Sequence, residues 1–233
     1  DLVTGLPNRR FFLKYAEQIL RAAKRHGHAC ALLQINLNRF KQINETLGQS
    51  AGDALLRETA RRLRIAVRET DPVASASGGD ELSHIGGDEF TVMLERVQKV
   101  EHASVAARRI LAALAEPYRI DSREITLTSR VGIALYPEDA SDSIILLQHA
   151  GAAANHAKEQ TRSGYQFFSR EINAKAYQHL IMENQLRKAL ERDELVLYYQ
   201  PKVDVVTGQI HGAEALVRWR HPELGLLPPG RFL

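Results

Sequence analysis

Two adjacent acidic residues follow a pair of glycines near the middle of the chain, in the run Gly86-Gly87-Asp88-Glu89-Phe90. Glycine has no Cβ, so a turn built from two of them lets a phosphorylated ligand approach the backbone closely. Neighbouring carboxylates can bind a hard divalent cation or take a proton from a hydroxyl. Because short motifs also occur by chance, the same residues could form a hairpin turn with two solvated acids.

Other polar residues lie on both sides of this turn. Asn44 offers an amide and Asp53 a carboxylate for hydrogen bonding, and Lys158 and Arg162 lie four residues apart, on one face of a predicted helix. Each also has a structural alternative. Asn44 could end a helical turn, Asp53 could cap a helix, and the two cations could interact only with a helix dipole.

The hydrophobic pattern predicts helices and strands that alternate around one sheet. Residues 9–25 are expected to form a helix that ends near Gly27. Residues 30–38 are expected to form a strand with alternating faces, one with Ala31, Leu33, Ile35 and Leu37 and the other with Cys30, Leu32, Gln34 and Asn36. The remaining expected elements are a helical turn over 40–45, a helix that begins at Gly52, two strands that flank the turn at 86–89, a helix over 98–115, a strand over 125–135, a helix over 143–160 and a short strand over 165–168. This order indicates α/β or α+β layering.

Taken together, these segments resemble the GGDEF domain of diguanylate cyclases over about residues 1–168. The matching residues are 1–10, 35–44, 48, 52–53, 84–94, 157–162 and 165–168. The resemblance implies the ferredoxin-like sheet that nucleotide cyclases share with polymerase palms, flanked by helices, with the GGDEF turn on a central hairpin.

Diguanylate cyclases join two GTP molecules into cyclic di-GMP, with one GTP held by each of two facing domains. The resemblance therefore implies GTP and cyclic di-GMP as ligands, Mg²⁺ or Mn²⁺ as cofactor, and a homodimer for any cyclase activity. Catalysis of phosphoryl transfer is mostly positioning and charge neutralisation. The implied catalytic residues are Asp88 and Glu89. The same two residues, position 36 and the Leu37 backbone form the implied metal site. The implied substrate-binding residues are Asn44, Asp53, Lys41, Lys158 and Arg162.

One departure affects the implied metal site. The first strand of active cyclases ends in an Asp-x-Asp pair whose first Asp binds metal, whereas this chain has Asn36-Leu37-Asn38. An amide oxygen can bind Mg²⁺, but it brings no negative charge and bridges two cations poorly. A unit charge about 4 Å from a cation is worth at most about 4 kcal/mol at an effective dielectric of 20. We therefore expect GTP binding to survive and rapid cyclisation to be lost. The usual His after Gly48 is Gln49 here, a milder change.

A second departure precedes the GGDEF turn. Arg68 and Asp71 match the Arg-x-x-Asp site at which cyclic di-GMP inhibits many cyclases, but residues 72–85 separate Asp71 from Gly86, a longer gap than in the family. We expect residues 75–83, including a second Gly-Gly-Asp-Glu-Leu run at 78–82, to form an extended, mobile loop, because their composition gives them no face to bury. Inhibition at this site would require the insertion to loop out.

A second resemblance begins at Leu195. The residues around Gln200 and the run Glu214-Ala215-Leu216 resemble the opening of an EAL domain, the cyclic di-GMP phosphodiesterase module. The resemblance implies metal binding by Glu214, with Gln200 and Arg218 near metal and phosphate. Because an EAL domain is a TIM-like barrel of about 250 residues, residues 195–233 can supply only its first strands. The expected organisation is a GGDEF domain over 1–168, a linker helix over 169–194 and an incomplete EAL β-hairpin over 195–233.

Composition adds constraints on partners. The 44% hydrophobic and 25% charged residues are typical of a globular protein, and no apolar stretch is long enough for a membrane span. Because the net charge is only +3 and the basic residues lie on predicted helices, we expect no nucleic-acid binding. The single cysteine, Cys30, is expected to be a buried thiol. A cytoplasmic location is expected, with no membrane contact by this segment, although a longer parent could be attached to a membrane through upstream domains.

Three functions are compatible with these residues. The leading hypothesis is a bacterial cyclic di-GMP signalling protein whose GGDEF domain is a weakened or regulatory diguanylate cyclase that still binds GTP. The first alternative is an active cyclase that tolerates Asn36 because Asp88, Glu89 and phosphate oxygens hold the metals. The second is a non-catalytic scaffold that binds no nucleotide.

Overall fold

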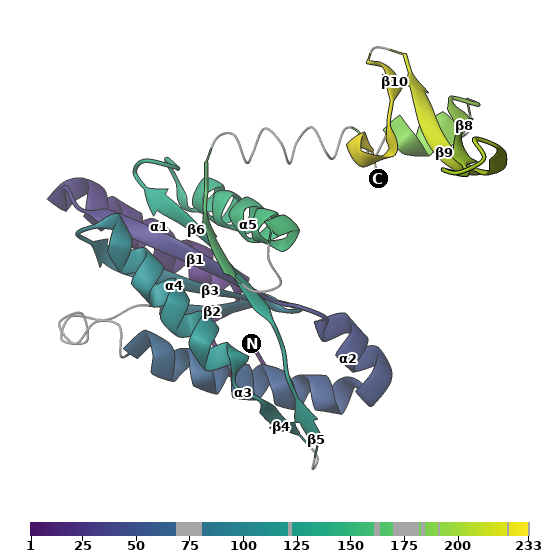
Figure 1. Cartoon of the computed structure of the whole chain (residues 1–233). Helices are drawn as coiled ribbons and strands as arrows, with labels where there is room; N and C mark the ends of the chain where they lie inside the picture. Colours follow the sequence, from purple (N-terminus) through teal and green to yellow (C-terminus); the bar gives the residue numbers. More distant parts are fainter. Residues whose placement is uncertain are drawn as a thin grey trace. The chain divides into compact units, whose positions relative to one another are not determined.

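The structure is a computed structural model, and it describes residues 1–68, 81–120, 123–160, 164–169, 182, 185–190, 192–222 and 224–232. The side chains of Arg68, Glu81 and residues 158–160 lie outside this description. The chain divides into two compact units, Asp1–Asn173 and Ala174–Leu233, which are considered separately (Figure 1).

The first unit is built on a five-stranded sheet with the order β2-β3-β1-β6-β7. The central strand β1 pairs antiparallel with β3 on one side and with β6 on the other, and β7 lies parallel to β6. The strands are β1 (Ala29–Leu37), β2 (Glu81–Gly86), β3 (Glu89–Val97), β6 (Ser129–Tyr136) and β7 (Gly164–Phe167). This mixed α/β sheet with flanking helices confirms the predicted fold class.

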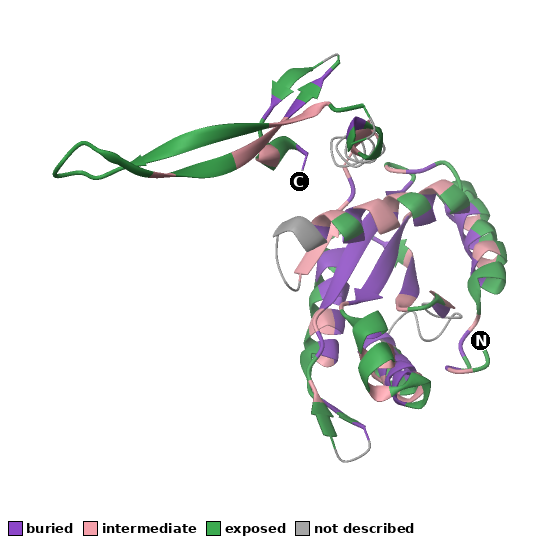
Figure 2. Cartoon of the chain, turned by 90° about the vertical axis from the view of Figure 1, so that its right-hand side faces the viewer, coloured by how far each residue is buried: buried purple, intermediate pink, exposed green. Residues whose placement is uncertain are grey.

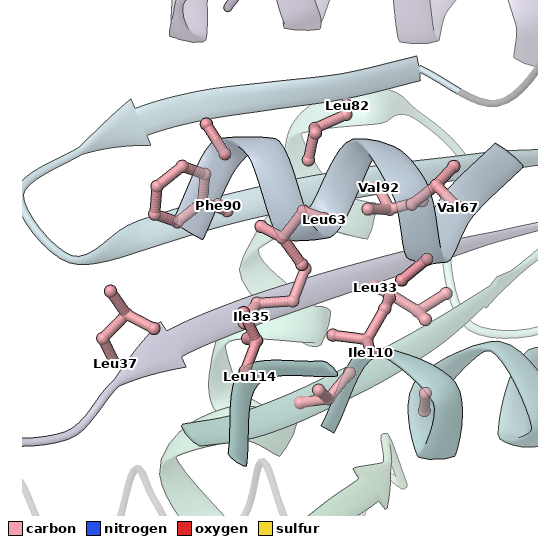
Figure 3. Packing of buried hydrophobic residues seen from close by; sticks show 14 of the residues in the cluster. Leu33, Ile35, Leu37, Leu63, Val67, Leu82, Phe90, Val92, Ile110 and Leu114 are labelled. Carbon is pink, nitrogen blue, oxygen red and sulfur yellow. The ribbon is translucent and has the colours of Figure 1, made fainter. Parts of the chain in front are cut away.

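Helices cover both faces of the sheet, and two hydrophobic clusters result. The odd-numbered residues of β1 pack against α3 (Gln49–Arg68) and α4 (Val100–Ala115), where Leu33 and Ile35 meet Leu63 and Ile110 (Figure 3). The even-numbered residues Cys30 and Leu32 pack against α1 (Arg9–His26) and α5 (Ser143–Gln160). The sheet is therefore buried on both faces, as Figure 2 shows, and the alternation predicted for this strand is confirmed.

Sequence signals at both ends define α1. Asn8 caps the helix by accepting a hydrogen bond from the Phe11 amide at 3.0 Å, and Gly27 ends it in the left-handed conformation with φ of 67°. Asn8 also forms an isolated parallel bridge with His84 of β2. The start of α1 is thereby held beside the GGDEF turn.

Gly132 of β6 allows α5 to lie directly on the sheet. A Cβ at this position would come within 1.9 Å of the Ala150 carbonyl oxygen and 2.2 Å of the Ala154 amide nitrogen. Because these are backbone atoms, no side-chain rotation could relieve the overlap. The rest of unit 1 comprises α2 (Phe40–Leu47) and the small hairpin of β4 (Tyr118–Ile120) and β5 (Arg123–Ile125).

The structure corrects three local predictions. Residues 81–83 are part of strand β2 rather than a loop, and Leu82 and Ser83 are buried because β3 pairs with them. Helix α3 begins at Gln49, so Asp53 lies within the helix and is not its N-cap. The strand expected over 125–135 is divided into β5 and β6. Residues 75–80 lie outside the described part of the chain.

The second unit contains a three-stranded sheet with the order β10-β9-β8. Its strands are β8 (Leu195–Val203), β9 (Ile210–His221) and β10 (Gly225–Leu227), and Pro229–Arg231 forms a 3₁₀ turn, η2. Trp219 is fully buried beside Ala189, Leu227 and Phe232, and its indole nitrogen donates to Glu194 Oε2 at 2.9 Å. Across both units, no helix among the described residues has the length and hydropathy that crossing a membrane requires.

Candidate functional site

The GGDEF turn is held in one conformation by its neighbours. Gly86 and Gly87 have φ of 138° and 59°, values that residues with a side chain rarely adopt. The Asp88 carbonyl accepts from the Leu37 amide at 3.1 Å, and His84 Nε2 donates to the Gly87 carbonyl at 3.1 Å. Burial lowers the pKa of His84, although the hydrogen bond to the Gly87 carbonyl opposes this shift. The turn therefore lies at the end of β1.

Three polar residues form a row across the sheet at this end. Asn36 of β1 lies directly opposite Glu89 of β3 on one side and Arg130 of β6 on the other. Directly paired residues have Cβ atoms about 4.5–5.5 Å apart on the same face of a sheet. Asn36 is 8% exposed and Arg130 is 7% exposed. A row of this kind, with two buried polar residues and a carboxylate at one end of the sheet, indicates a site for a polar ligand.

The charges in this row perturb one another. Burial and the nearby Asp88 carboxylate raise the pKa of Glu89, although Gln34, Arg9 and Asn36 oppose this shift. Burial lowers the pKa of Arg130, and the attraction of Asp88 opposes it. Asn36 Oδ1 and the Nε and Nη1 atoms of Arg130 are buried and have no hydrogen-bond partner among the described residues. These three atoms are available to a ligand.

The proposed guanine-reading residues lie on two adjacent helices. Asn44 is in the last turn of α2, and Asp53 is in the second turn of α3. Asn44 Oδ1 is buried without a hydrogen-bond partner and lies so close to Gly52 that a Cβ there would be 1.8 Å from it. An acceptor in this state could receive a hydrogen bond from a base edge.

The other predicted residues of unit 1 are only partly described. Lys41 is exposed and lies 3.8 Å from Glu45 Oε1. Lys158 is in the last turn of α5, but its side chain lies outside the described part, as does the side chain of Arg68 at the end of α3. Arg162 and Asp71 are entirely outside it.

A divalent cation would meet a limited set of ligands here. Asp88 and Glu89 offer carboxylates, Asn36 offers its unpartnered Oδ1, and Leu37 offers backbone. Among the described residues, no group of three or more His, Cys, Asp and Glu side chains could hold a metal ion. Because the Arg130 cation faces Asn36, these residues do not fit a pair of divalent cations.

The predicted EAL residues face one another across the β8–β9 hairpin. Gln200 pairs directly with Glu214, and Lys202 Nζ lies 4.0 Å from Glu214 Oε2. Arg218 lies on the same face of β9 as Glu214, with its guanidinium 6.0 Å from the centre of the Tyr198 ring. Gln200 and Glu214 are exposed to solvent.

Sequence reasoning missed Arg130. A charged residue within the apolar run of residues 129–136 was a signal, because a strand that is buried on both faces rarely contains an arginine. Its position opposite Asn36 depends on the register between β1 and β6, which the sequence does not reveal.

Comparison with known proteins agrees with this geometry. The sequence model of the family described as "Diguanylate cyclase, GGDEF domain" matches residues 1–164, and that of the "EAL domain" matches residues 183–233. The solved GGDEF domain of TpbB (YfiN) from Pseudomonas aeruginosa is 35% identical, with a TM-score of 0.69, and the match covers 76% of this chain and 98% of that one.

Two curated relatives from Pseudomonas aeruginosa match the whole chain. The bifunctional diguanylate cyclase/cyclic di-GMP phosphodiesterase MucR is 40% identical over 233 residues, which are 100% of this chain and 33% of MucR. The cyclic di-GMP phosphodiesterase NbdA is 40% identical over 233 residues, which are 100% of this chain and 28% of NbdA. The chain thus spans a third or less of these relatives.

The fold and the site define a GGDEF domain, a class that generally depends on metal ions. The chain belongs to the diguanylate cyclase GGDEF family and carries a segment of an EAL domain after it, as in the GGDEF–EAL proteins of cyclic di-GMP signalling.

Proposed function

We propose that the first unit binds GTP with selectivity for guanine and forms cyclic di-GMP slowly or not at all. It would then act as a weakened or regulatory diguanylate cyclase within a GGDEF–EAL protein. Mg²⁺ or Mn²⁺ is the proposed ion, and residual cyclase activity would require two copies of the domain to face each other.

The observation that carries this proposal is the identity and setting of Asn36. This residue lies one position before the end of the central strand, beside Asp88 and Glu89, where a carboxylate would supply charge to metal ions. The amide retains an acceptor oxygen but brings no charge, and Arg130 opposite it adds a positive one. Both features disfavour the accumulation of divalent cations that phosphoryl transfer requires.

Guanine selectivity is supported by the pair Asn44 and Asp53. A site whose buried polar groups are matched to one base rejects a base that leaves them unpaired. Asn44 Oδ1 is buried without a partner, and so it would gain a hydrogen bond from guanine. Lys41, Lys158 and Arg162 are the proposed contacts to the phosphates, with Asp88 and Glu89 near the reacting groups.

An active cyclase is the second candidate, and the unpartnered Asn36 Oδ1 favours it. This oxygen is free to bind one cation together with Asp88 and Glu89. In that case, substrate phosphates would supply the missing negative charge. The rate of cyclic di-GMP formation separates this candidate from the first.

Calorimetric titration of the chain with GTP and with ATP, each in excess Mg²⁺, tests the binding part of the proposal. We expect GTP to bind at least about tenfold more tightly than ATP, since one unpaired buried polar group is worth about that factor or more. Asp53→Ala should weaken GTP binding and leave ATP binding nearly unchanged. Equal affinities for the two nucleotides would contradict guanine selectivity. If neither nucleotide binds, the proposal fails and a non-catalytic scaffold that binds no nucleotide is favoured instead.

A further inference from the structure

Arg130 is a buried cation, and two of its hydrogen-bond donors have no partner within the described part of the protein. Its side chain is on β6, the residue is 7% exposed, and its Nε and Nη1 atoms are buried without a partner. Among the described residues, no carboxylate lies within ion-pair distance of it. A buried guanidinium is unfavourable unless acceptors satisfy its donors.

The surroundings of Arg130 indicate what those acceptors are. Asn36 lies directly across the strand pair, and Glu89 continues the same row on β3. Asp88 is near enough to attract the guanidinium without binding it directly. The cation therefore lies beside the GGDEF turn, where the proposed function places the phosphates of GTP.

Asn36 and Arg130 both make the site more positive than a strand end that carries a carboxylate at position 36. Relative to a strand end with a carboxylate at position 36, the amide makes the site one unit more positive. The guanidinium of Arg130 adds a second unit, so the two residues together change the charge of the site by as much as one divalent cation would. A guanidinium also donates in a planar fork that fits two phosphate oxygens.

We propose that Arg130 binds the phosphate chain of GTP directly and replaces one of the two divalent cations of a diguanylate cyclase site. This inference rests on the proposed binding of GTP to the first unit. GTP affinity in this domain then depends only weakly on divalent cations, and the nucleotide-free protein has little affinity for Mn²⁺.

The first test measures GTP affinity by calorimetry in excess Mg²⁺ and again in EDTA. The wild-type affinity should differ less than about tenfold between the two conditions, because the guanidinium supplies a charge-assisted contact that chelation cannot remove. Arg130→Gln should lose at least about tenfold in EDTA and less in Mg²⁺. Arg130→Lys, which retains the charge but not the fork, should lie between the two. Arg119→Gln, which removes an exposed arginine on β4, is the matched control and should behave as wild type.

The second test does not depend on nucleotide. Binding of Mn²⁺ alone is measured by electron paramagnetic resonance for the wild type and for Asn36→Asp/Arg130→Ser. The double variant should bind Mn²⁺ at least about tenfold more tightly, because the site becomes two charges more negative. Thermal melting verifies that each variant is folded.

The outcomes separate this inference from the proposed function. GTP binding in Mg²⁺ that EDTA abolishes in the wild type would overturn the role of Arg130 and leave GTP binding intact. Equal Mn²⁺ affinity for the wild type and the double variant would likewise overturn it. A failure of GTP to bind in either condition would overturn the proposed function and this inference together.

Discussion

The carboxamide of Asn44 in α2 lies against the Cα of Gly52 in α3, so closely that a Cβ at Gly52 would be 1.8 Å from Asn44 Oδ1. The glycine therefore sets the position of the amide that we propose to read guanine. Because the Asn44 side chain has two rotatable bonds, a methyl group added at Gly52 would displace the carboxamide without separating α2 from α3.

Gly52→Ala should therefore weaken GTP binding at least about tenfold, as expected when one base-reading hydrogen bond is lost. Stability should stay constant or rise by up to about 1 kcal/mol, since alanine is the better helix former. Calorimetry and urea denaturation measure the two effects. Gly212→Ala, at a position with no atom within 4 Å of a new Cβ, is the control and should leave GTP binding unchanged. Unchanged affinity in Gly52→Ala would contradict the role given to Asn44.

Gly132→Ala, unlike Gly52→Ala, should greatly lower the stability of the protein. The new Cβ would overlap backbone atoms of Ala150 and Ala154, so α5 would have to move away from β6. Overpacking of this kind costs about 1–3 kcal/mol, and more where backbone cannot yield. Urea denaturation measures the change. A variant as stable as the wild type would show that α5 does not lie against the sheet in this way.

Arg62 joins α3 to the end of α4. Its Nε donates to Glu58 Oε1 at 2.9 Å, its other nitrogens donate to the carbonyls of Ala113, Glu116 and Pro117, and its guanidinium lies 3.9 Å from the centre of the Tyr118 ring. Arg62→Lys should lower the unfolding free energy by about 2 kcal/mol, because an ammonium cannot make all these contacts. Arg61→Lys, at an exposed position that pairs with Glu58 alone among the described residues, should change it by less than about 0.5 kcal/mol. Equal effects of the two substitutions in thermal melting would refute this role.

Acid should weaken the contacts that Glu58 makes with Arg61 and Arg62. Hydrogen bonds from Arg61 above all, and also from Arg62, lower the pKa of Glu58 to about 2. A lowered folded-state pKa means that the contribution to stability is present above the ordinary value of 4.5 and is lost as pH falls toward 2. Glu58→Gln should therefore show a smaller fall in unfolding free energy between pH 5 and pH 2.5 than the wild type. An identical fall in both proteins would mean that this carboxylate does not contribute.

Strand β8 leads to a prediction about the second unit. It lies at the edge of its sheet, and Leu197 and Tyr199 are 57% and 66% exposed. Exposed apolar edges pair readily with other chains. Hydrogen exchange of residues 197–202 should slow as protein concentration rises, and Tyr199→Lys should abolish this dependence. Val205→Lys, which adds the same charge outside the strand, should leave it intact. Strong protection that is independent of concentration would show that the hairpin is stable by itself.

Local signals account for much of the fold. Asn8 and Gly27 bound α1 as the sequence indicates, and the alternation over residues 30–37 correctly separates the two clusters of the core. The sequence also locates the turn at 86–89, the buried thiol of Cys30 and the hairpin that follows Leu195. In each case, the determining residues are close together in the chain.

Non-local pairing accounts for the errors. Leu82 and Ser83 look like loop residues beside Gly79 and Asp80, but the ladder with β3 makes them part of a buried strand. Asp53 looks like a helix cap because Gly52 precedes it, but α3 begins one turn earlier, where Gly48 ends α2. The relationship of Arg130 to Asn36 depends on register, which only the assembled sheet defines.

The most direct test of the central claim is the rate at which the chain converts GTP to cyclic di-GMP, followed by chromatography, beside the same measurement for Asn36→Asp/Arg130→Ser. We expect the wild type to form little or no product and the double variant to be at least about tenfold faster, because each tenfold in rate requires only about 1.4 kcal/mol of the electrostatic stabilisation that the two changes restore. Rapid turnover by the wild type, together with no increase in the double variant, would contradict the view that Asn36 and Arg130 convert this cyclase domain into a GTP-binding one.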